Sequence, residues 1–185
     1  MIYTSLIQKA IRFSIKTHEV YQKQKRKGKD IPYLAHPLTV GLILARVGAS
    51  EDVIVAGILH DTIEDSTPEK KVSRDMLEER FGPTVADIVL SVSETSKELP
   101  WEERKREAIE HIKSFSHDSL LVKSADVLSN GSELIDDYAR DGDQVFARFN
   151  APKDKIVGHY LSVISAITER WPEIRSWWIL SLIHI

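Results

Sequence analysis

Four ionisable residues follow directly on an apolar run. His60, Asp61, Glu64 and Asp65 come after residues 53–59, which carry no polar side chain. Such a run predicts a helix buried on all sides, and charged groups at its end need partners because an unpaired buried charge is costly. On one continuous helix, His60 and Glu64 would stack four residues apart, with Asp61 and Asp65 on the neighbouring stripe. We expect a cation, most simply a bound metal ion, in front of that face.

A His-Asp pair alone is weak evidence, because the chain contains a second copy at His117-Asp118. That copy lies beside Ser119 at a predicted helix start, where Asp118 or Ser119 is more simply a helix cap. The first copy differs in its apolar surroundings and in the two acids that follow it. We therefore look for chemistry at the first copy alone.

Two residues elsewhere in the chain share this apolar setting. His36 stands at the head of a predicted helix, and Asp126 is the single acid of an apolar segment. Taken singly, His36 could be a structural histidine, and Asp126 could pair with Lys123 three residues earlier. Together with His60 and Asp61, they form a set of two imidazoles and two carboxylates that could hold a metal ion.

The chemistry that suits this set is phosphate hydrolysis. A divalent ion lowers the pKa of a bound water and neutralises charge on a phosphoryl oxygen. Glu64 and Asp65 remain nearby, where a carboxylate can orient or deprotonate the water. The basic run at residues 23–29 leads into His36 and favours an anionic substrate, although a solvated loop also explains a short charge run.

Composition narrows the class of protein. The chain has 185 residues, 42% hydrophobic and 29% charged, which suits one globular domain. A net charge of −3 gives no reason to expect nucleic-acid binding, and the absence of cysteine excludes disulfides and thiolate metal sites. The first ten residues lack the apolar core of a signal peptide, and the apolar stretch 177–185 is too short to span a bilayer. We expect a cytoplasmic protein without a membrane partner.

Helical periodicity dominates the chain and no alternating strand pattern appears, so the predicted fold class is all-α, in a single domain over residues 1–185. Ser50 is the expected N-cap of the third helix, and Gly131 is expected to bend the chain. The predicted helices cover residues 4–21, 37–47, 51–65, 73–81, 84–93, 100–115, 119–130, 133–140 and 153–170, with a last aromatic helix from Pro172.

These residues, in this order, resemble the HD-domain metal-dependent phosphohydrolases. More narrowly, they are similar to the alarmone hydrolases, which comprise the hydrolase half of the bifunctional RelA/SpoT enzymes and its small stand-alone relatives. The resemblance covers about residues 1–170. The matching stretches are Arg26-Lys27 with residues 32–37, then residues 56–65, then residues 123–126 with Asn130.

The resemblance implies an all-helical HD-domain fold that binds Mn²⁺, or another divalent metal, and a phosphorylated nucleotide. It implies removal of the 3′-pyrophosphate from guanosine tetra- or pentaphosphate, (p)ppGpp, through a metal-activated water. No synthetase segment follows, so we expect hydrolysis only. Carried over by position, the metal ligands are His36, His60, Asp61 and Asp126, the catalytic pair is Glu64 and Asp65, and the substrate-binding residues are Arg26, Lys27 and Asn130.

Two alternatives remain open at this point. Residues 127–132 lack the basic and apolar residues that the family carries after its last metal ligand, so the substrate could be another nucleotide or phosphorylated metabolite. The chain could also be a binding protein that keeps the metal or nucleotide without turnover. Intact Glu64 and Asp65 argue against the binding protein, since a binder needs no water-activating pair. The sequence does not determine the oligomeric state.

Overall fold

The computed structural model describes residues 4–94 and 98–174. Within these ranges the chain is helical with no strand, apart from one isolated antiparallel bridge between Lys25 and Pro32, and the all-α prediction is confirmed. The helices are α1 (Ser5–Ile15), the π-helix η1 (Lys16–Tyr21), α2 (Ala35–Arg46), α3 (Glu51–Leu59), α4 (Thr62–Asp65), η2 (Pro68–Lys70), α5 (Arg74–Phe81), α6 (Pro83–Val92), α7 (Trp101–Ile112), α8 (His117–Asp141), η3 (Gly142–Arg148) and α9 (Lys153–Arg170).

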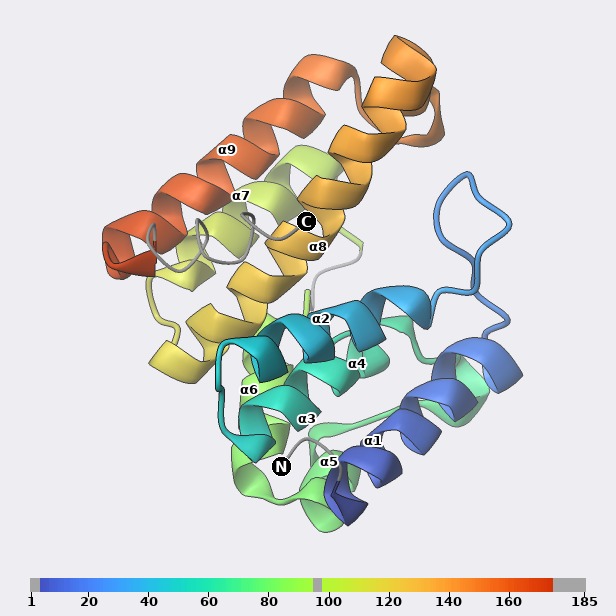
Figure 1. The fold of residues 1–185 in the computed structure, drawn as a ribbon, viewed down its shortest axis with the longest axis vertical. Coiled ribbons are helices and arrows are strands. Elements are labelled where there is room, and N and C mark those ends of the chain that lie inside the picture. The colour runs from blue at the N-terminus through green and yellow to red at the C-terminus, as the bar shows by residue number, and fades with distance from the viewer. Residues whose placement is uncertain (1–3, 95–97, 175–185) are drawn as a thin grey trace.

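Helix α3 is the centre of one group of helices. It packs against α1, α2, α6 and α8, which explains why every residue from Val53 to Leu59 is buried (Figure 1). The neighbouring helix α2 lies very close to α3 at Gly41. A Cβ atom added at Gly41 would lie only 2.6 Å from Ile58 Cγ1. The two helices thus bring His36, at the start of α2, close to the end of α3.

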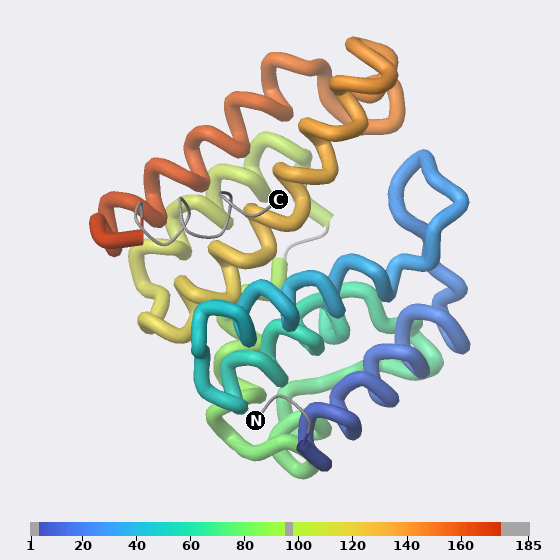
Figure 2. The backbone as a smooth tube through the Cα atoms, in the orientation of Figure 1, coloured from blue at the N-terminus to red at the C-terminus, as the bar shows by residue number. Residues whose placement is uncertain are grey.

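Helix α8 joins this group to a second one formed with α7 and α9 (Figure 2). Its residues Val122 and Ala125 belong to the larger hydrophobic core, whereas Leu120 and Val127 belong to the core shared with α9. Asp126 therefore lies on α8 at the seam between the two cores. Among the described residues, no helix has both the length and the apolar character needed to cross a bilayer.

Serine side chains cap the N-termini of α3 and α8, and the sequence predicts the first of these caps. Ser50 Oγ accepts the Val53 N–H at 3.4 Å at the start of α3. At the start of α8 the cap is Ser116, whose Oγ accepts the Ser119 N–H at 3.1 Å, so the predicted capping role of Asp118 or Ser119 is wrong. The reason is that the helix begins at His117, which leaves the preceding serine in the capping position.

The prediction of one helix through His60 and Asp65 is also wrong. Helix α3 ends at Leu59, a turn contains His60 and Asp61, and α4 begins at Thr62. Side chains compete for the last carbonyls of α3, because Thr62 Oγ1 donates to Leu59 O at 2.6 Å and His60 Nδ1 donates to Gly57 O at 2.8 Å. The stacking inferred from a continuous helix therefore does not apply.

The predicted bend at Gly131 is absent, because α8 is continuous from His117 to Asp141. A single glycine weakens a helix by only about 1 kcal/mol, and the packing of α8 against α2, α3, α6 and α9 offsets that cost. The helix predicted from Pro172 and the apolar tail at 177–185 lie largely outside the described residues.

Candidate metal centre and active-site cavity

Side chains from three places in the chain converge. The Nε2 atoms of His36 and His60 are 3.2 Å apart, and Asp126 Oδ1 lies 3.3 Å from the first and 3.9 Å from the second. Asp61 Oδ2 lies 3.0 Å from His60 Nε2 and 3.7 Å from His36 Nε2. The four predicted ligands are therefore neighbours, although they come from the start of α2, the turn after α3, and the middle of α8.

Hydrogen bonds behind the site fix the orientation of these donors. The Nδ1–H of His60 donates to the Gly57 carbonyl, which leaves Nε2 as the nitrogen that faces the site. His36 Nδ1 lies 3.0 Å from Ser129 Oγ, and the Tyr33 hydroxyl donates to Asp61 Oδ2 at 2.5 Å. Such anchoring behind the ligands is typical of metal centres.

The sequence interpretation missed the roles of Tyr33 and Ser129. Tyr33 lies within residues 32–37, one of the stretches that resemble the family, and this resemblance is the one sequence signal that points to it. Ser129 belongs to the segment that departs from the family pattern, and the structure shows that this departure includes a partner of His36.

Asp126 satisfies both interpretations of its sequence context. Its Oδ2 accepts a hydrogen bond from Lys123 Nζ at 2.8 Å, as the simple ion-pair reading predicts. Its Oδ1 faces His36 and also accepts from Asn130 Nδ2 at 2.6 Å. Burial alone would raise the pKa of Asp126, but Lys123 and the two histidines hold it well below its usual range. The ion pair with Lys123 therefore keeps the carboxylate charged and able to bind a cation.

The electrostatics of the four groups fit a divalent cation. Burial would lower the pKa of His60, but the carboxylates of Asp61 and Asp126 raise it to about 9. Burial and the charge of Asp126 would raise the pKa of Asp61, but His60 and His36 hold it below its ordinary value. Two ionised carboxylates thus surround the imidazoles and attract positive charge. Imidazole nitrogen with carboxylate oxygen is a donor set for first-row divalent metals.

The two acids that follow this site differ in their surroundings. Glu64 Oε2 accepts the Glu94 backbone N–H at 3.1 Å, and burial together with the charge of Asp61 raises the pKa of Glu64 to about 7. Asp65 Oδ2 accepts a hydrogen bond from Gln24 Nε2 at 2.9 Å. Glu64 lines a cavity, whereas Asp65 is hydrogen-bonded to Gln24 in the loop between η1 and α2.

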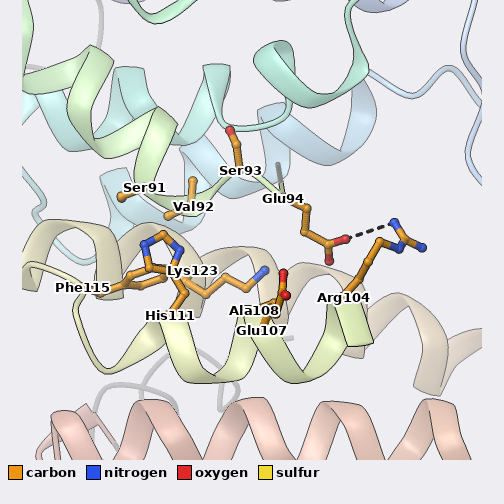
Figure 3. A pocket seen from close by; sticks show the side chains of 10 residues that line it. All are labelled: Ser91, Val92, Ser93, Glu94, Arg104, Glu107, Ala108, His111, Phe115 and Lys123. Atoms are coloured by element: carbon orange, nitrogen blue, oxygen red, sulfur yellow. Dashed lines mark hydrogen bonds and ion pairs between the residues drawn. The ribbon is translucent and has the colours of Figure 1, made fainter. Parts of the chain in front are cut away.

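A cavity of about 320 Å³ opens in front of the converging donors. Its wall includes His60, Asp61, Glu64 and Asp126 together with aromatic and basic side chains. A smaller pocket of about 180 Å³ adjoins it under α7 (Figure 3). The two share Glu94 and Arg104, whose side chains meet at 3.2 Å. The aromatic and basic lining of the larger cavity comprises Lys27, Tyr33, Trp101, Arg104, Lys105, Lys123, Phe149, His159 and Tyr160.

The basic loop between η1 and α2 is only partly directed at this cavity. Arg26 is paired with Glu133 Oε2 at 2.5 Å and donates to Asn130 Oδ1 at 2.7 Å. Lys29 pairs with Glu133 Oε1 at 2.6 Å. Lys27 lines the cavity itself. Of the three predicted substrate-binding residues, Arg26 and Asn130 are therefore joined to one another, while Lys27 and Asn130 both line the cavity.

A buried carboxylate on α8 anchors this loop. Asp137 has a side chain only 2% exposed, yet it pairs with Lys29 at 2.6 Å and Arg148 at 2.7 Å. Burial alone would raise the pKa of Asp137, but the hydrogen bonds from Lys29 and Arg148 lower it. We expect Asp137→Asn to lower the free energy of unfolding by about 3 kcal/mol, because it leaves two cations beside a neutral group. Urea unfolding at pH 7 measures the change.

The neighbouring Asp136→Asn is a matched control, because Asp136 is exposed. Since the pKa of Asp137 is lower in the folded state, its contribution is present above the unfolded pKa of about 3.9 and is lost as pH falls below it. The stability difference between the wild type and Asp137→Asn should therefore shrink below about pH 4. A difference that persists unchanged at low pH would contradict an ionic origin.

Comparison with known proteins identifies the family of this chain. The family model described as HD domain matches residues 10–157. The Danio rerio protein named guanosine-3′,5′-bis(diphosphate) 3′-pyrophosphohydrolase MESH1 is 38% identical over 133 residues, which cover 71% of this chain and 70% of that protein. A solved structure from Listeria monocytogenes EGD-e is 33% identical with a TM-score of 0.65, covering 72% of this chain and 83% of that one.

A further solved structure supports the fold alone. It is described as a metazoan ortholog of SpoT that hydrolyzes ppGpp, and it is 24% identical with a TM-score of 0.64. The match covers 91% of this chain and 97% of that chain. From the family match over most of the sequence, and from the identity with the Danio rerio protein, we conclude that this chain belongs to the HD domain family of metal-dependent phosphohydrolases.

Proposed function

We propose that the protein is a Mn²⁺-dependent hydrolase that removes the 3′-pyrophosphate from (p)ppGpp. The observation that carries the proposal is the convergence of His36, His60, Asp61 and Asp126. The last three of these line a cavity that Glu64 also lines. Its support also includes the similarity to a relative named for this reaction.

His36, His60, Asp61 and Asp126 would hold the metal. Imidazole and carboxylate donors suit Mn²⁺, and in this chain no cysteine competes for a softer metal. When bound, the metal supplies Lewis-acid polarisation of the phosphoryl group and lowers the pKa of water. Lys123 stays paired with Asp126 and compensates part of the negative charge of the donor set.

Glu64 is the group best placed to move a proton. Its carboxyl lines the cavity, and its pKa of about 7 lets it exchange a proton near neutral pH. The backbone N–H of Glu94 holds one carboxyl oxygen in place, so the group is already oriented before the substrate arrives. Asp65 serves as the second acid of the pair, orienting the water or assisting the leaving group.

The nucleotide would occupy the cavity and the adjoining space beside the basic loop. That second space has a volume of about 380 Å³ and is lined by Tyr33, Phe149 and Tyr160 together with Lys27 and Arg148. Aromatic faces suit a nucleobase, and cations suit phosphates. Burial, with the nearby charges of Arg148 and Lys105, lowers the pKa of Lys27. A polyphosphate would relieve this accumulation of positive charge.

One assay tests the proposal. The purified protein is incubated with Mn²⁺ and ppGpp, with ordinary nucleotides, and with nicotinamide dinucleotide phosphates, and the products are separated by chromatography. We expect pyrophosphate and GDP from ppGpp. Phosphate release from another compound instead would assign the site to a different substrate. Stoichiometric metal binding without turnover of any compound would indicate a binding protein.

Lys27→Ala should raise KM for ppGpp by roughly 10- to 100-fold, since a charge-assisted hydrogen bond contributes about 1.5–3 kcal/mol. The affinity for Mn²⁺ should not change, because Lys27 is not among the converging donors. Steady-state kinetics and calorimetric metal titration measure both quantities. Lys23→Ala is the matched control from the same loop, since Lys23 is exposed and lines neither the cavity nor the adjoining space. Equal KM values for both variants would remove Lys27 from the substrate site.

A further inference from the structure

A buried chain of hydrogen bonds ends on Asp65. His18 is 0% exposed, and its Nδ1 lies 3.1 Å from Gln24 Oε1. The other end of the same amide, Gln24 Nε2, donates to Asp65 Oδ2 at 2.9 Å. The sequence interpretation assigned no role to either His18 or Gln24, and the reaction proposed above does not use them.

The direction of this chain follows from the chemistry of its members. An ionised carboxylate only accepts hydrogen bonds, so Gln24 must present its NH₂ group to Asp65. Its carbonyl oxygen then faces His18, which must donate from Nδ1–H. His18 Nε2 has no hydrogen-bond partner within the described part of the chain, as expected for the bare nitrogen of a neutral ring. Every donor in the chain therefore points toward Asp65.

The fold holds Gln24 in place from both sides. Its backbone N–H donates to His18 O at 2.9 Å, and its carbonyl accepts from the Tyr33 N–H at 3.0 Å. The His18 ring packs on the Tyr33 ring with 5.0 Å between centroids. His18 lies on η1, a π-helix, and such irregular turns often mark functional sites. The Gln24 side chain is thus a fixed donor.

Asp65 depends on such support more than a residue inside a long helix would. It is the last residue of α4, which has only four residues, and a single turn has little stability of its own. The packing of α4 against η1 brings the Gln24 amide to it.

We propose that His18 and Gln24 are positioning residues that hold the Asp65 carboxylate in one orientation for hydrolysis. The inference rests on the proposed function, in which Asp65 belongs to the acid pair. We expect Gln24→Ala to lower kcat for ppGpp by roughly 10- to 100-fold, the usual cost of removing a partner behind an active-site group. The affinity for Mn²⁺ should stay within about twofold of the wild type, because Gln24 contributes no donor atom to the metal site. Gln24 also lines the space beside the basic loop, so KM is measured separately from kcat.

The decisive experiment is a double-mutant cycle. Gln24→Ala is made in the wild type and in an Asp65→Asn background, with kcat, KM and metal affinity measured for all four proteins. Since Gln24 acts through Asp65, its removal should cost little once Asp65 is gone. Gln22→Ala is the matched control, because Gln22 is an exposed residue of the same segment. Full turnover in Asp65→Asn, or equal losses from Gln24→Ala in both backgrounds, would overturn the proposal.

A second measurement does not depend on turnover. The ¹⁵N spectrum of the His18 ring, assigned with His18→Asn, should show Nδ1 protonated and Nε2 bare in the wild type, and a mixture of tautomers in Gln24→Ala. A mixture in the wild type would overturn the inference. If the wild type fails to cleave ppGpp while His18 shows the single tautomer, the proposed function is wrong and the hydrogen-bond chain still stands.

Discussion

Replacing Asp126 with alanine is expected to abolish divalent-metal binding and, with it, hydrolysis. Asp126 is the donor that α8 brings to the histidines, with Oδ1 3.3 Å from His36 Nε2. Loss of a partner behind a ligand already costs about 10- to 100-fold in metal affinity, so loss of the ligand itself should exceed about 100-fold. Calorimetric titration with Mn²⁺ measures the affinity. Thermal unfolding gives an independent readout, because Mn²⁺ should stabilise only proteins that bind it.

The alanine variant also leaves Lys123 buried without its carboxylate, and that loss can destabilise the fold. Asp126→Asn avoids this difficulty, because it keeps the side-chain volume while removing the charge. Asp118→Ala is the matched control, as it removes the aspartate of the second His-Asp pair at the start of the same helix. Retention of wild-type metal affinity in folded Asp126→Asn and Asp126→Ala would sink the assignment of Asp126 as a ligand.

Glu64→Gln is expected to keep the metal and lose turnover. The glutamine keeps the size of the side chain and can still accept the Glu94 N–H, but it cannot take or give a proton. General acid–base catalysis contributes about 10²- to 10⁴-fold, so kcat should fall by roughly that factor. The metal affinity should stay within about twofold of the wild type, because Glu64 is not one of the converging donors. Steady-state kinetics and metal titration on the same preparation separate the two effects.

Glu69→Gln is the control for this substitution, since Glu69 is exposed on the turn η2 that follows α4. Undiminished turnover in Glu64→Gln would refute its role as the proton-transferring group. Loss of metal together with turnover would instead place Glu64 among the ligands. The two variants, Asp126→Asn and Glu64→Gln, thus distinguish residues that hold the metal from residues that use it.

Local sequence patterns predicted most of the helices. The cap at Ser50 and the apolar run that follows it describe α3 correctly up to Leu59, because capping and apolar periodicity depend on residues within a few positions. The same local reasoning failed at His60 and at Gly131. At His60, side-chain hydrogen bonds to the carbonyls of α3 end the helix, and at Gly131 the packing of α8 continues it.

The sequence likewise predicted part of the candidate site, and the structure supplied the rest. The sequence alone singled out His36, His60, Asp61 and Asp126 as a possible donor set, because ionisable groups in apolar surroundings need partners. The sequence did not show whether Asp126 pairs with Lys123 or joins the histidines. In the structure, Oδ2 of Asp126 pairs with Lys123 and Oδ1 faces His36.

Patterns along the chain predict the all-helical class, the types of the site residues and the chemistry that those types allow. The packed fold was needed to show that Glu133 holds Arg26, that Ser129 lies against His36, and that Gln24 reaches Asp65. Caps and periodicity are interactions between near neighbours in the chain and can be read along it. These three contacts join segments that are far apart in the chain, and the packing of the fold selects the partners.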